Sequence, residues 1–318
     1  MVELSIIIVS WNTRELLREC LLSLYRHTTD IAFEVFVVDN NSSDGSAEMV
    51  RNNFPKVILI ENAENAGFSK ANNQAIQLSK GRYIALLNPD TVLIEDVFSP
   101  LIKYADLNEK IGAIGPKILS RDRKTIQYAC ARRLPNLYFD FCRLSGLNWR
   151  FPQSRLLGGE VISYWDHNSS RYVEALSGAC MVVRRPAIEN VGLMDESQFM
   201  YGDEIDWCRR LLDNGWGVYY YSGASIIHYG GESAKQICQL ASLEAEKAMR
   251  HYYKKHNGRI YAYLFSVQVF FFSLGKYVWS KLSREKDCRI EELMTIYKAM
   301  FIWSFKALLG RGEGRLSR

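Results

Sequence analysis

Apolar residues alternate between short continuous runs and helically spaced positions along the first hundred residues. The continuous runs are typical of buried strands and cover residues 4–9, 34–39, 57–61 and 83–87. The helically spaced segments predict amphipathic helices at residues 15–25, from residue 45 to about 53, and at 69–79. Strands that alternate with helices predict an α/β fold, with a mostly parallel central sheet flanked by helices.

Polar residues gather where each predicted strand ends. They include Asp39 after the second strand, Asn65 and Gly67 after the third, and Asn88 and Asp90 after the fourth. Ligands of open α/β sheets bind at this edge, and a carboxylate such as Asp90 suits Mg²⁺ or Mn²⁺ that bridges phosphates. The alternative is that Asp and Asn simply form the turns after the strands.

The second half of the chain is less regular. Residues 120–172 are rich in arginine and aromatic residues and predict long loops over the site. Further elements are expected as an extended segment at 173–184, a short helix that Pro186 opens, a helix at 203–213, and short strands at 218–221 and 225–227.

Two groups in this half could carry chemistry. Asp203, Glu204 and Asp206 stand at the start of a helix, where they could complement the helix dipole or supply a general base. His228 follows a strand, and it is either a structural histidine or a metal ligand beside a carboxylate.

The C-terminal part contains two apolar helical stretches. Residues 260–275 carry no charge, and their length is borderline for a membrane span. On a helix, Arg259, Ser266, Ser273, Lys276, Ser280 and Arg284 form one stripe, and aromatic residues lie largely off it. This pattern favours a helix in the membrane interface, with the aromatic residues in lipid and the cations toward the head groups. Residues 293–309 repeat it. The alternative is that both helices pack on the protein body or on a second copy in a homodimer.

Charge divides the chain in the same way. The formal net charge is +5, yet residues 250–318 hold 14 basic and 5 acidic residues, so this tail carries +9 and the rest carries −4. We therefore expect a catalytic domain at 1–249 and a basic, aromatic, membrane-associating helical region at 250–318. Nucleic acid is not an expected partner, because the tail's aromatic residues are spaced as helix faces.

Composition narrows the class of protein further. The chain is 48% hydrophobic and 24% charged, which excludes a disordered protein. Its 7 cysteines are scattered without a C-x-x-C pair, and the N-terminus lacks the pattern of a signal peptide, so a reducing, cytoplasmic compartment is expected. No G-x-G-x-x-G or P-loop motif is present, which argues against dinucleotide-binding and P-loop proteins.

Six ordered motifs resemble those of the inverting, metal-dependent family 2 glycosyltransferases of the GT-A fold, especially the rhamnosyltransferase-like members. The motifs are S-I-I-I-V-S-W-N-T at 5–13, V-V-D-N-N-S-S-D-G-S at 37–46, E-N-A-G-F-S-K-A-N-N at 64–73, L-L-N-P-D-T at 86–91, L-S-G-A-C-M-V-V-R-R at 176–185 and F-M-Y-G-D-E-I-D-W-C-R-R at 199–210.

The resemblance implies roles for individual residues. Glu204 would be the general base, with Asp203 as its rival, and Asp90 and His228 would hold Mg²⁺ or Mn²⁺. Asp39 would bind the base of the nucleotide, and Gly178 would lie beside the donor sugar and the acceptor. The other residues expected to bind the donor are Val9, Asn12, Asn65, Gly67, Asn72 and Asn88.

The resemblance also implies a reaction. A sugar, with rhamnose from dTDP-rhamnose as the preferred donor, would pass to a hydroxyl of a lipid-linked or polysaccharide acceptor at the cytoplasmic face of the membrane. Asn88 departs from the family's D-x-D motif, and this leaves the metal's identity open. A non-catalytic subunit or scaffold that binds nucleotide sugars is the alternative function.

Overall fold

A computed structural model describes residues 2–197, 201–230, 238–282 and 288–311. The chain divides into two compact units. The first contains residues 1–134, 165–199 and 203–236, and the second contains residues 135–164, 200–202 and 237–318.

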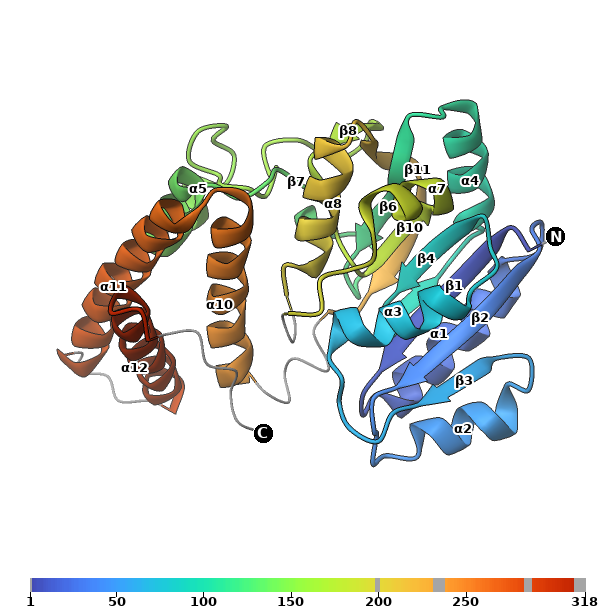
Figure 1. The fold of residues 1–318 in the computed structure, drawn as a ribbon, viewed down its shortest axis with the longest axis horizontal. Helices are drawn as coiled ribbons and strands as arrows, with labels where there is room; N and C mark the ends of the chain where they lie inside the picture. Colours follow the sequence, from blue (N-terminus) through green and yellow to red (C-terminus); the bar gives the residue numbers. More distant parts are fainter. Residues whose placement is uncertain (1, 198–200, 231–237, 283–287, 312–318) are drawn as a thin grey trace. The chain divides into compact units, whose positions relative to one another are not determined.

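The first unit is built on a mixed sheet of nine strands (Figure 1). The strand order is β3-β2-β1-β4-β10-β6-β11-β5, and β8 pairs with β11. The bounds are β1 Leu4–Ser10, β2 Phe33–Asp39, β3 Ile58–Glu61, β4 Tyr83–Leu87, β5 Thr91–Leu93, β6 Ile111–Leu119, β8 Arg171–Val173, β10 Cys180–Arg184 and β11 Gly217–His228.

The first four strands are parallel, and their register aligns their carboxyl ends. Ser10 at the end of β1 pairs with Asp39 at the end of β2, which pairs with Glu61 at the end of β3. Strand β10 then runs antiparallel between β4 and β6. The predicted α/β class is confirmed, and the predicted polar loops do meet at one edge of the sheet.

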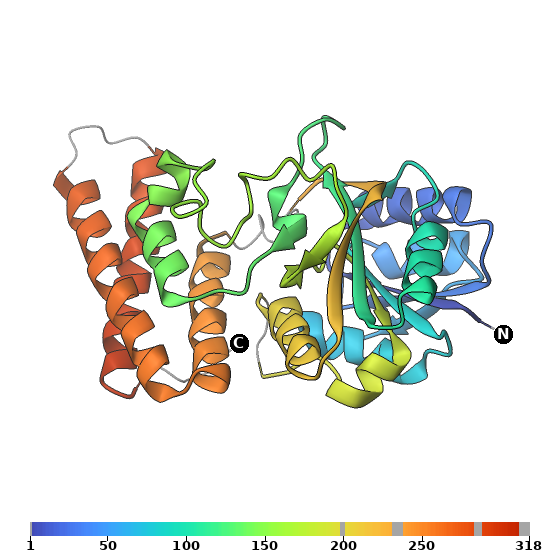
Figure 2. The same cartoon turned by 90° about the horizontal axis from the view of Figure 1, so that it is seen from above.

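Helices cover both faces of this sheet. Their bounds are α1 Arg14–His27, α2 Ser46–Asn53, α3 Phe68–Leu78, α4 Phe98–Leu107, α7 Arg185–Val191 and α8 Asp203–Asp213. Right-handed crossovers place α1 and α2 on one face and α3 on the other, with α8 on the side of α3 (Figure 2). The sheet's core is mostly apolar, as at Leu4, Ile6 and Ile8, which are fully buried.

Several elements differ from the sequence predictions. Strand β11 is one strand of 12 residues, with a register shift between Tyr221 and Ser225 where the sequence predicted a break between two strands. The region 120–172 is not only loops. It contains the 3₁₀ helix at Tyr128–Cys130, β7 Ala131–Arg132, α5 Leu137–Ser145 and α6 Leu147–Arg150, and β7 pairs with β9 Ala175–Leu176.

The second unit is helical. Besides α5 and α6 it contains α10 Cys238–His256, α11 Arg259–Leu282 and α12 Cys288–Leu308. Among the described residues, no helix has the length and apolar character that a membrane span needs. The borderline span at 260–280 is therefore not a spanning helix.

Helix α11 turns its small polar residues inward. Ser266, Ser273 and Ser280 are buried, and each hydroxyl donates to a carbonyl of the preceding turn. Lys276 on the same stripe is half-buried, and desolvation lowers the pKa of its ammonium group. The serines of this stripe therefore do not face lipid head groups, whereas Arg259 on the same stripe is exposed. Arg284 lies outside the described residues.

The second unit also buries a group of charges. The Arg143 guanidinium donates to both oxygens of Glu246, at 2.7 and 3.0 Å, and to Asp140 at 2.9 Å. Tyr253 donates to the other oxygen of Asp140. Burial raises the pKa of Asp140 to about 6. These bonds join α5 to α10, so the segment expected to be a loop is tied to the C-terminal helices.

Candidate active site

Backbone hydrogen bonds hold the loops at the carboxyl edge of the sheet together. The Asn40 amide donates to Ser10, and the Asn62 amide donates to Asp39. On the other side, Asn88 donates to Ala179, and Tyr229 donates to Asp90. These bonds join two groups of loops at this edge: the loops after β1, β2 and β3, and the loops after β4 and β11 with the segment before β10.

Asp39 is buried at this edge, and one of its carboxylate oxygens accepts no hydrogen bond from the described residues. Only 3% of the residue is exposed. Its Oδ2 accepts a hydrogen bond from the Ser42 amide at 2.9 Å, and its Oδ1 has no partner among the described residues. A buried carboxylate oxygen without a donor is costly, so this oxygen is suited to bind a ligand N–H or O–H group.

Asn12 and Asn72 form hydrogen bonds to neighbouring protein groups. Asn12 has φ of +51°, and its Oδ1 accepts from the Ser43 amide at 2.8 Å, which joins the loops after β1 and β2. Asn72 is buried, and its amide donates to the carbonyl of Phe68 one turn earlier in α3. The structure thus gives both asparagines bonds within the protein. Val9 is half-buried at the end of β1.

The turn before α3 is shaped by Asn65 and Gly67. The Asn65 Oδ1 accepts the Gly67 amide at 3.0 Å, and the Gly67 carbonyl accepts the side-chain amide of Asn40 at 3.1 Å. Gly67 has φ of +81°, which side chains with a Cβ adopt at a cost. This turn therefore depends on a glycine.

Asp90 and His228 come together from β4 and β11. The His228 Nε2 lies 3.1 Å from Oδ1 of Asp90 and 3.4 Å from the amide nitrogen of Asn88. Gln127 donates to the His228 carbonyl at 2.7 Å, and its Oε1 faces Nδ1 of His228 at 2.9 Å. Gln127 thereby fixes the tautomer with hydrogen on Nδ1.

Oδ1 of Asp90 and Nε2 of His228, 3.1 Å apart, can share a bound cation, or they form an ion pair when both ring nitrogens carry hydrogen. An imidazole and a carboxylate fit a divalent transition metal, with hard carboxylate oxygen also suited to Mg²⁺. The described residues contain no larger cluster of three or more His, Cys, Asp or Glu that could hold a metal.

The two acids at the start of α8 have opposite surroundings. Asp203 is buried, and burial together with the charge of Glu204 raises its pKa well above the ordinary 3.8. Glu204 is half-buried, and its Oε1 accepts a hydrogen bond from Nη2 of Arg132 at 2.7 Å. Adjacent carboxyls in such different environments are typical of sites with distinct acid and base roles.

Gly178 lies against Glu204. A Cβ at this glycine would be 3.7 Å from the Glu204 Cβ and 3.6 Å from the ring of Phe68. The Asn88 amide, in the loop that carries Asp90, donates to the carbonyl of Ala179, the residue after Gly178. The segment 178–179 therefore lies next to both the acid pair and the Asp90 loop. The structure therefore brings Glu204, Gly178 and the loop of Asp90 into one neighbourhood.

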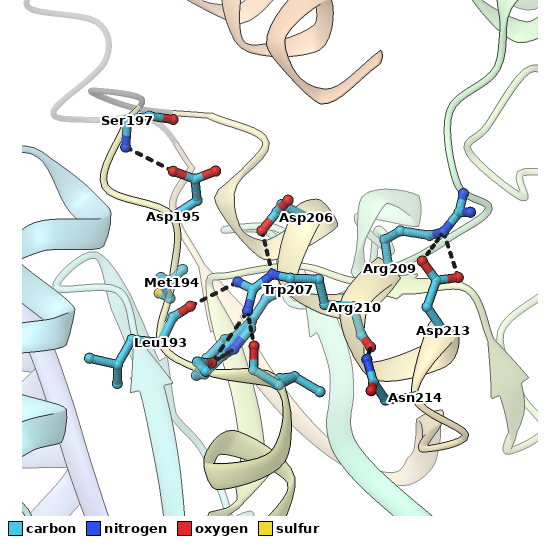
Figure 3. A network of polar contacts seen from close by, with 12 residues as sticks. Leu193, Met194, Asp195, Ser197, Asp206, Trp207, Arg209, Arg210, Asp213 and Asn214 are labelled. Carbon is cyan, nitrogen blue, oxygen red and sulfur yellow. Dashed lines mark hydrogen bonds and ion pairs between the residues drawn. The ribbon is translucent and has the colours of Figure 1, made fainter. Parts of the chain in front are cut away.

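The position of α8 depends on Arg210 (Figure 3). Its guanidinium bonds to Asp206 at 2.8 Å and to the carbonyls of Val191 and Leu193 at 2.7 and 2.9 Å. Asp206 thus supports the helix and belongs to a different group from Asp203 and Glu204. From α3, the Asn73 side chain donates to the carbonyl of Met194 at 2.9 Å and so fixes the same segment.

Sequence reasoning missed these supporting residues. The spacing of four residues between Asp206 and Arg210 was a visible signal for one contact. Gln127 and Arg132 gave no local signal, because they reach the site from a region expected to be loops.

Comparisons with known proteins agree with this geometry. The family model described as Glycosyl transferase family 2 matches residues 5–187. The N-acetylglucosaminyl-diphospho-decaprenol L-rhamnosyltransferase of Mycobacterium tuberculosis is 30% identical over 218 residues, 64% of this chain and 69% of that protein. The dTDP-rhamnosyl transferase RfbF of Shigella flexneri is 25% identical over 226 residues, 70% of this chain and 68% of that protein.

Among solved structures, the mannosyltransferase PcManGT of Pyrobaculum calidifontis, in complex with GDP-Man and Mn²⁺, has a TM-score of 0.56. It is 15% identical, and the match covers 96% of this chain and 87% of that one. At this identity the likeness shows the fold alone.

The raised pKa of Asp203 predicts a pH-dependent stability. The native state holds the Asp203 proton more tightly than the unfolded chain, so stability falls as the pH rises from about 3.8 toward the native pKa. We expect Asp203→Asn to leave the unfolding temperature unchanged near pH 4 and to raise it at pH 8.

Thermal unfolding followed by circular dichroism from pH 4 to 9 would measure this difference. Asp213→Asn is the matched control, because that carboxylate is exposed at the other end of α8 and pairs with Arg209. A difference for Asp203→Asn that does not grow with pH would contradict the raised pKa.

Proposed function

Because the chain belongs to glycosyltransferase family 2, we propose that it transfers rhamnose from dTDP-rhamnose to a hydroxyl of a lipid-linked acceptor, with inversion at the anomeric carbon. That it is a glycosyltransferase follows from the family match and the related enzymes. The donor, the acceptor, the metal and the roles of individual residues are the proposal.

The observation that carries the proposed mechanism is the contrast between Glu204 and Asp203. Glu204 is half-buried, lies against Gly178 and has Oε1 paired with Arg132, so it is the accessible carboxylate. Asp203 is buried with a raised pKa, which favours its protonated form. We assign Glu204 as the general base and Asp203 as a neighbour that adds no second charge.

The donor would lie along the carboxyl edge of the sheet. Asp39 offers its unpartnered Oδ1 to the nucleobase, and Gly178 leaves room for the sugar beside Glu204. Val9, Asn65 and Gly67 would line the nucleotide pocket. Asn12 and Asn72 would act through the loop and the helix that they hold, because their side chains bond to protein groups.

Asp90 and His228 would hold Mg²⁺ or Mn²⁺, with Asn88 beside them. When bound, the ion would offset negative charge on the leaving diphosphate. Gln127 would keep the imidazole turned toward this position through its bond to Nδ1. The Mn²⁺ in the mannosyltransferase structure supports a divalent ion in this fold.

The names of two relatives support the choice of donor and acceptor. One acts, by its name, on N-acetylglucosaminyl-diphospho-decaprenol with rhamnose, and the other is named a dTDP-rhamnosyl transferase. A polyprenyl diphosphate sugar is a lipid-linked acceptor, and a polysaccharide chain is the second candidate. We propose that the reaction takes place at the cytoplasmic face of the membrane.

We expect the purified chain to form a rhamnosylated product from dTDP-rhamnose and N-acetylglucosaminyl-diphospho-decaprenol, detected by mass spectrometry. A chelator should abolish transfer, and added Mn²⁺ or Mg²⁺ should restore it. His228→Ala should raise the Mn²⁺ concentration for half-maximal rate at least about tenfold, because it removes one of two ligands. His27→Ala on α1 is the control.

Two outcomes would contradict this proposal. Full activity in chelator would exclude the metal assignment. Donor binding without transfer to any of a panel of lipid-linked and polysaccharide acceptors would favour the alternative, a non-catalytic subunit that binds nucleotide sugars.

The second unit would bring the enzyme to the membrane. Large apolar side chains project from α11, and among them Phe271 and Trp279 are 65% and 68% exposed. Lys281 at the end of α11 and Lys298 and Lys306 on α12 are exposed as well. Exposed aromatic residues with nearby cations suit the surface of an anionic bilayer, where a helix too polar to span can lie in the interface.

We expect the double variant Phe271→Ser, Trp279→Ser to bind vesicles that contain phosphatidylglycerol at least about tenfold more weakly, because each side chain contributes about 1.5–3 kcal/mol on burial. Co-sedimentation with vesicles would measure the change. Leu107→Ser, which replaces an exposed leucine of α4, is the matched control. If the double variant binds vesicles normally but loses a dimer in analytical ultracentrifugation, a second copy covers this face instead.

A further inference from the structure

We infer that Arg132 is a positioning residue that sets the direction of the Glu204 carboxylate for proton transfer. The inference rests on the proposed function. It concerns a residue that the sequence motifs do not contain, since Arg132 lies between the motif at 86–91 and the motif at 176–185.

Arg132 is held in place by its strand. It stands on β7, where Ala131 pairs with Leu176 and Arg132 pairs with Ala175 of β9. The chain continues from β9 into Gly178, whose Cβ position lies 3.7 Å from the Glu204 Cβ. The same two-stranded sheet therefore carries the guanidinium and the glycine that both contact Glu204.

The contact is close and shielded. Nη2 of Arg132 lies 2.7 Å from Oε1 of Glu204, and the two side chains are 15% and 17% exposed. A charge-assisted hydrogen bond with so little solvent is stronger than an exposed ion pair. It removes the rotational freedom of the Glu204 side chain, which on the first turn of α8 would otherwise sample several rotamers.

The contact with Arg132 gives the two carboxylate oxygens of Glu204 different roles. Oε1 bonds to Arg132, and Oε2 remains to accept the hydroxyl proton of the acceptor. As that proton moves to Oε2, the hydroxyl oxygen forms its bond to the anomeric carbon. The bond from that carbon to the diphosphate oxygen breaks, and its electron pair leaves with the nucleoside diphosphate.

The bond to Arg132 affects the rate because it fixes the direction of the Glu204 carboxylate. A base that is held in line with the acceptor hydroxyl reacts faster, and a misplacement of about 1 Å lowers rates about 100-fold.

Arg132→Gln and Arg132→Lys test this role in the full chain, with dTDP-rhamnose and the lipid-linked acceptor as probes. We expect Arg132→Gln to lower kcat about 30- to 100-fold with both KM values within twofold of the unaltered protein. Arg132→Lys should recover part of the lost kcat. Arg209→Gln, which breaks the exposed pair with Asp213 on α8, is the matched control.

The competing outcomes are distinct. A kcat of Arg132→Gln within twofold of the unaltered protein would overturn the inference. So would a raised acceptor KM at unchanged kcat, which would make Arg132 a binding residue for the acceptor's diphosphate. A loss of activity that is matched by a lower unfolding temperature and is not recovered by Arg132→Lys would make its role structural. Absence of transfer by the unaltered protein would instead contradict the proposed function.

Discussion

The parallel register of β1, β2, β3 and β4 is the constraint on which the site depends. Because these strands end at one edge of the sheet, the loops that carry Asp39, Asn65 and Asp90 meet there. Backbone hydrogen bonds join the loops after β1, β2 and β3, and Asn12 adds a side-chain bond between the first two. From the second half of the chain, Ala179 and Tyr229 bond to the loop that carries Asp90.

The acid pair shows how one helix start gives two carboxyls different properties. Asp203 turns into the protein and loses water, whereas Glu204 meets a guanidinium that is fixed by a neighbouring strand. Helix α8, which carries both acids, is held in place by another of its residues, Arg210, which donates to the carbonyls of Val191 and Leu193. The chemistry assigned to Glu204 therefore depends on contacts that lie more than one turn away from it.

Much of the first unit could be predicted from sequence, since apolar runs and helical spacing over residues 4–87 reflect local burial. The pairing of Asp90 with His228 was also predicted, and it came from the family resemblance. Residues such as Arg132 and Gln127 could not be predicted, because they act through long-range pairing of a short strand and a single hydrogen bond. The serines on α11 were predicted to face outward and are buried. Helical spacing shows which residues share a face of the helix, but not whether that face packs against protein or meets the solvent.

The central claim is that Glu204, and not its buried neighbour Asp203, takes the proton of the acceptor. The most direct measurement is the kcat of Glu204→Gln and Asp203→Asn, each with saturating donor and acceptor, compared with the unaltered protein. The account predicts that Glu204→Gln loses about 10²- to 10⁴-fold, the usual contribution of a general base, and that Asp203→Asn stays within about tenfold. A large loss for Asp203→Asn together with near-normal turnover of Glu204→Gln would contradict it.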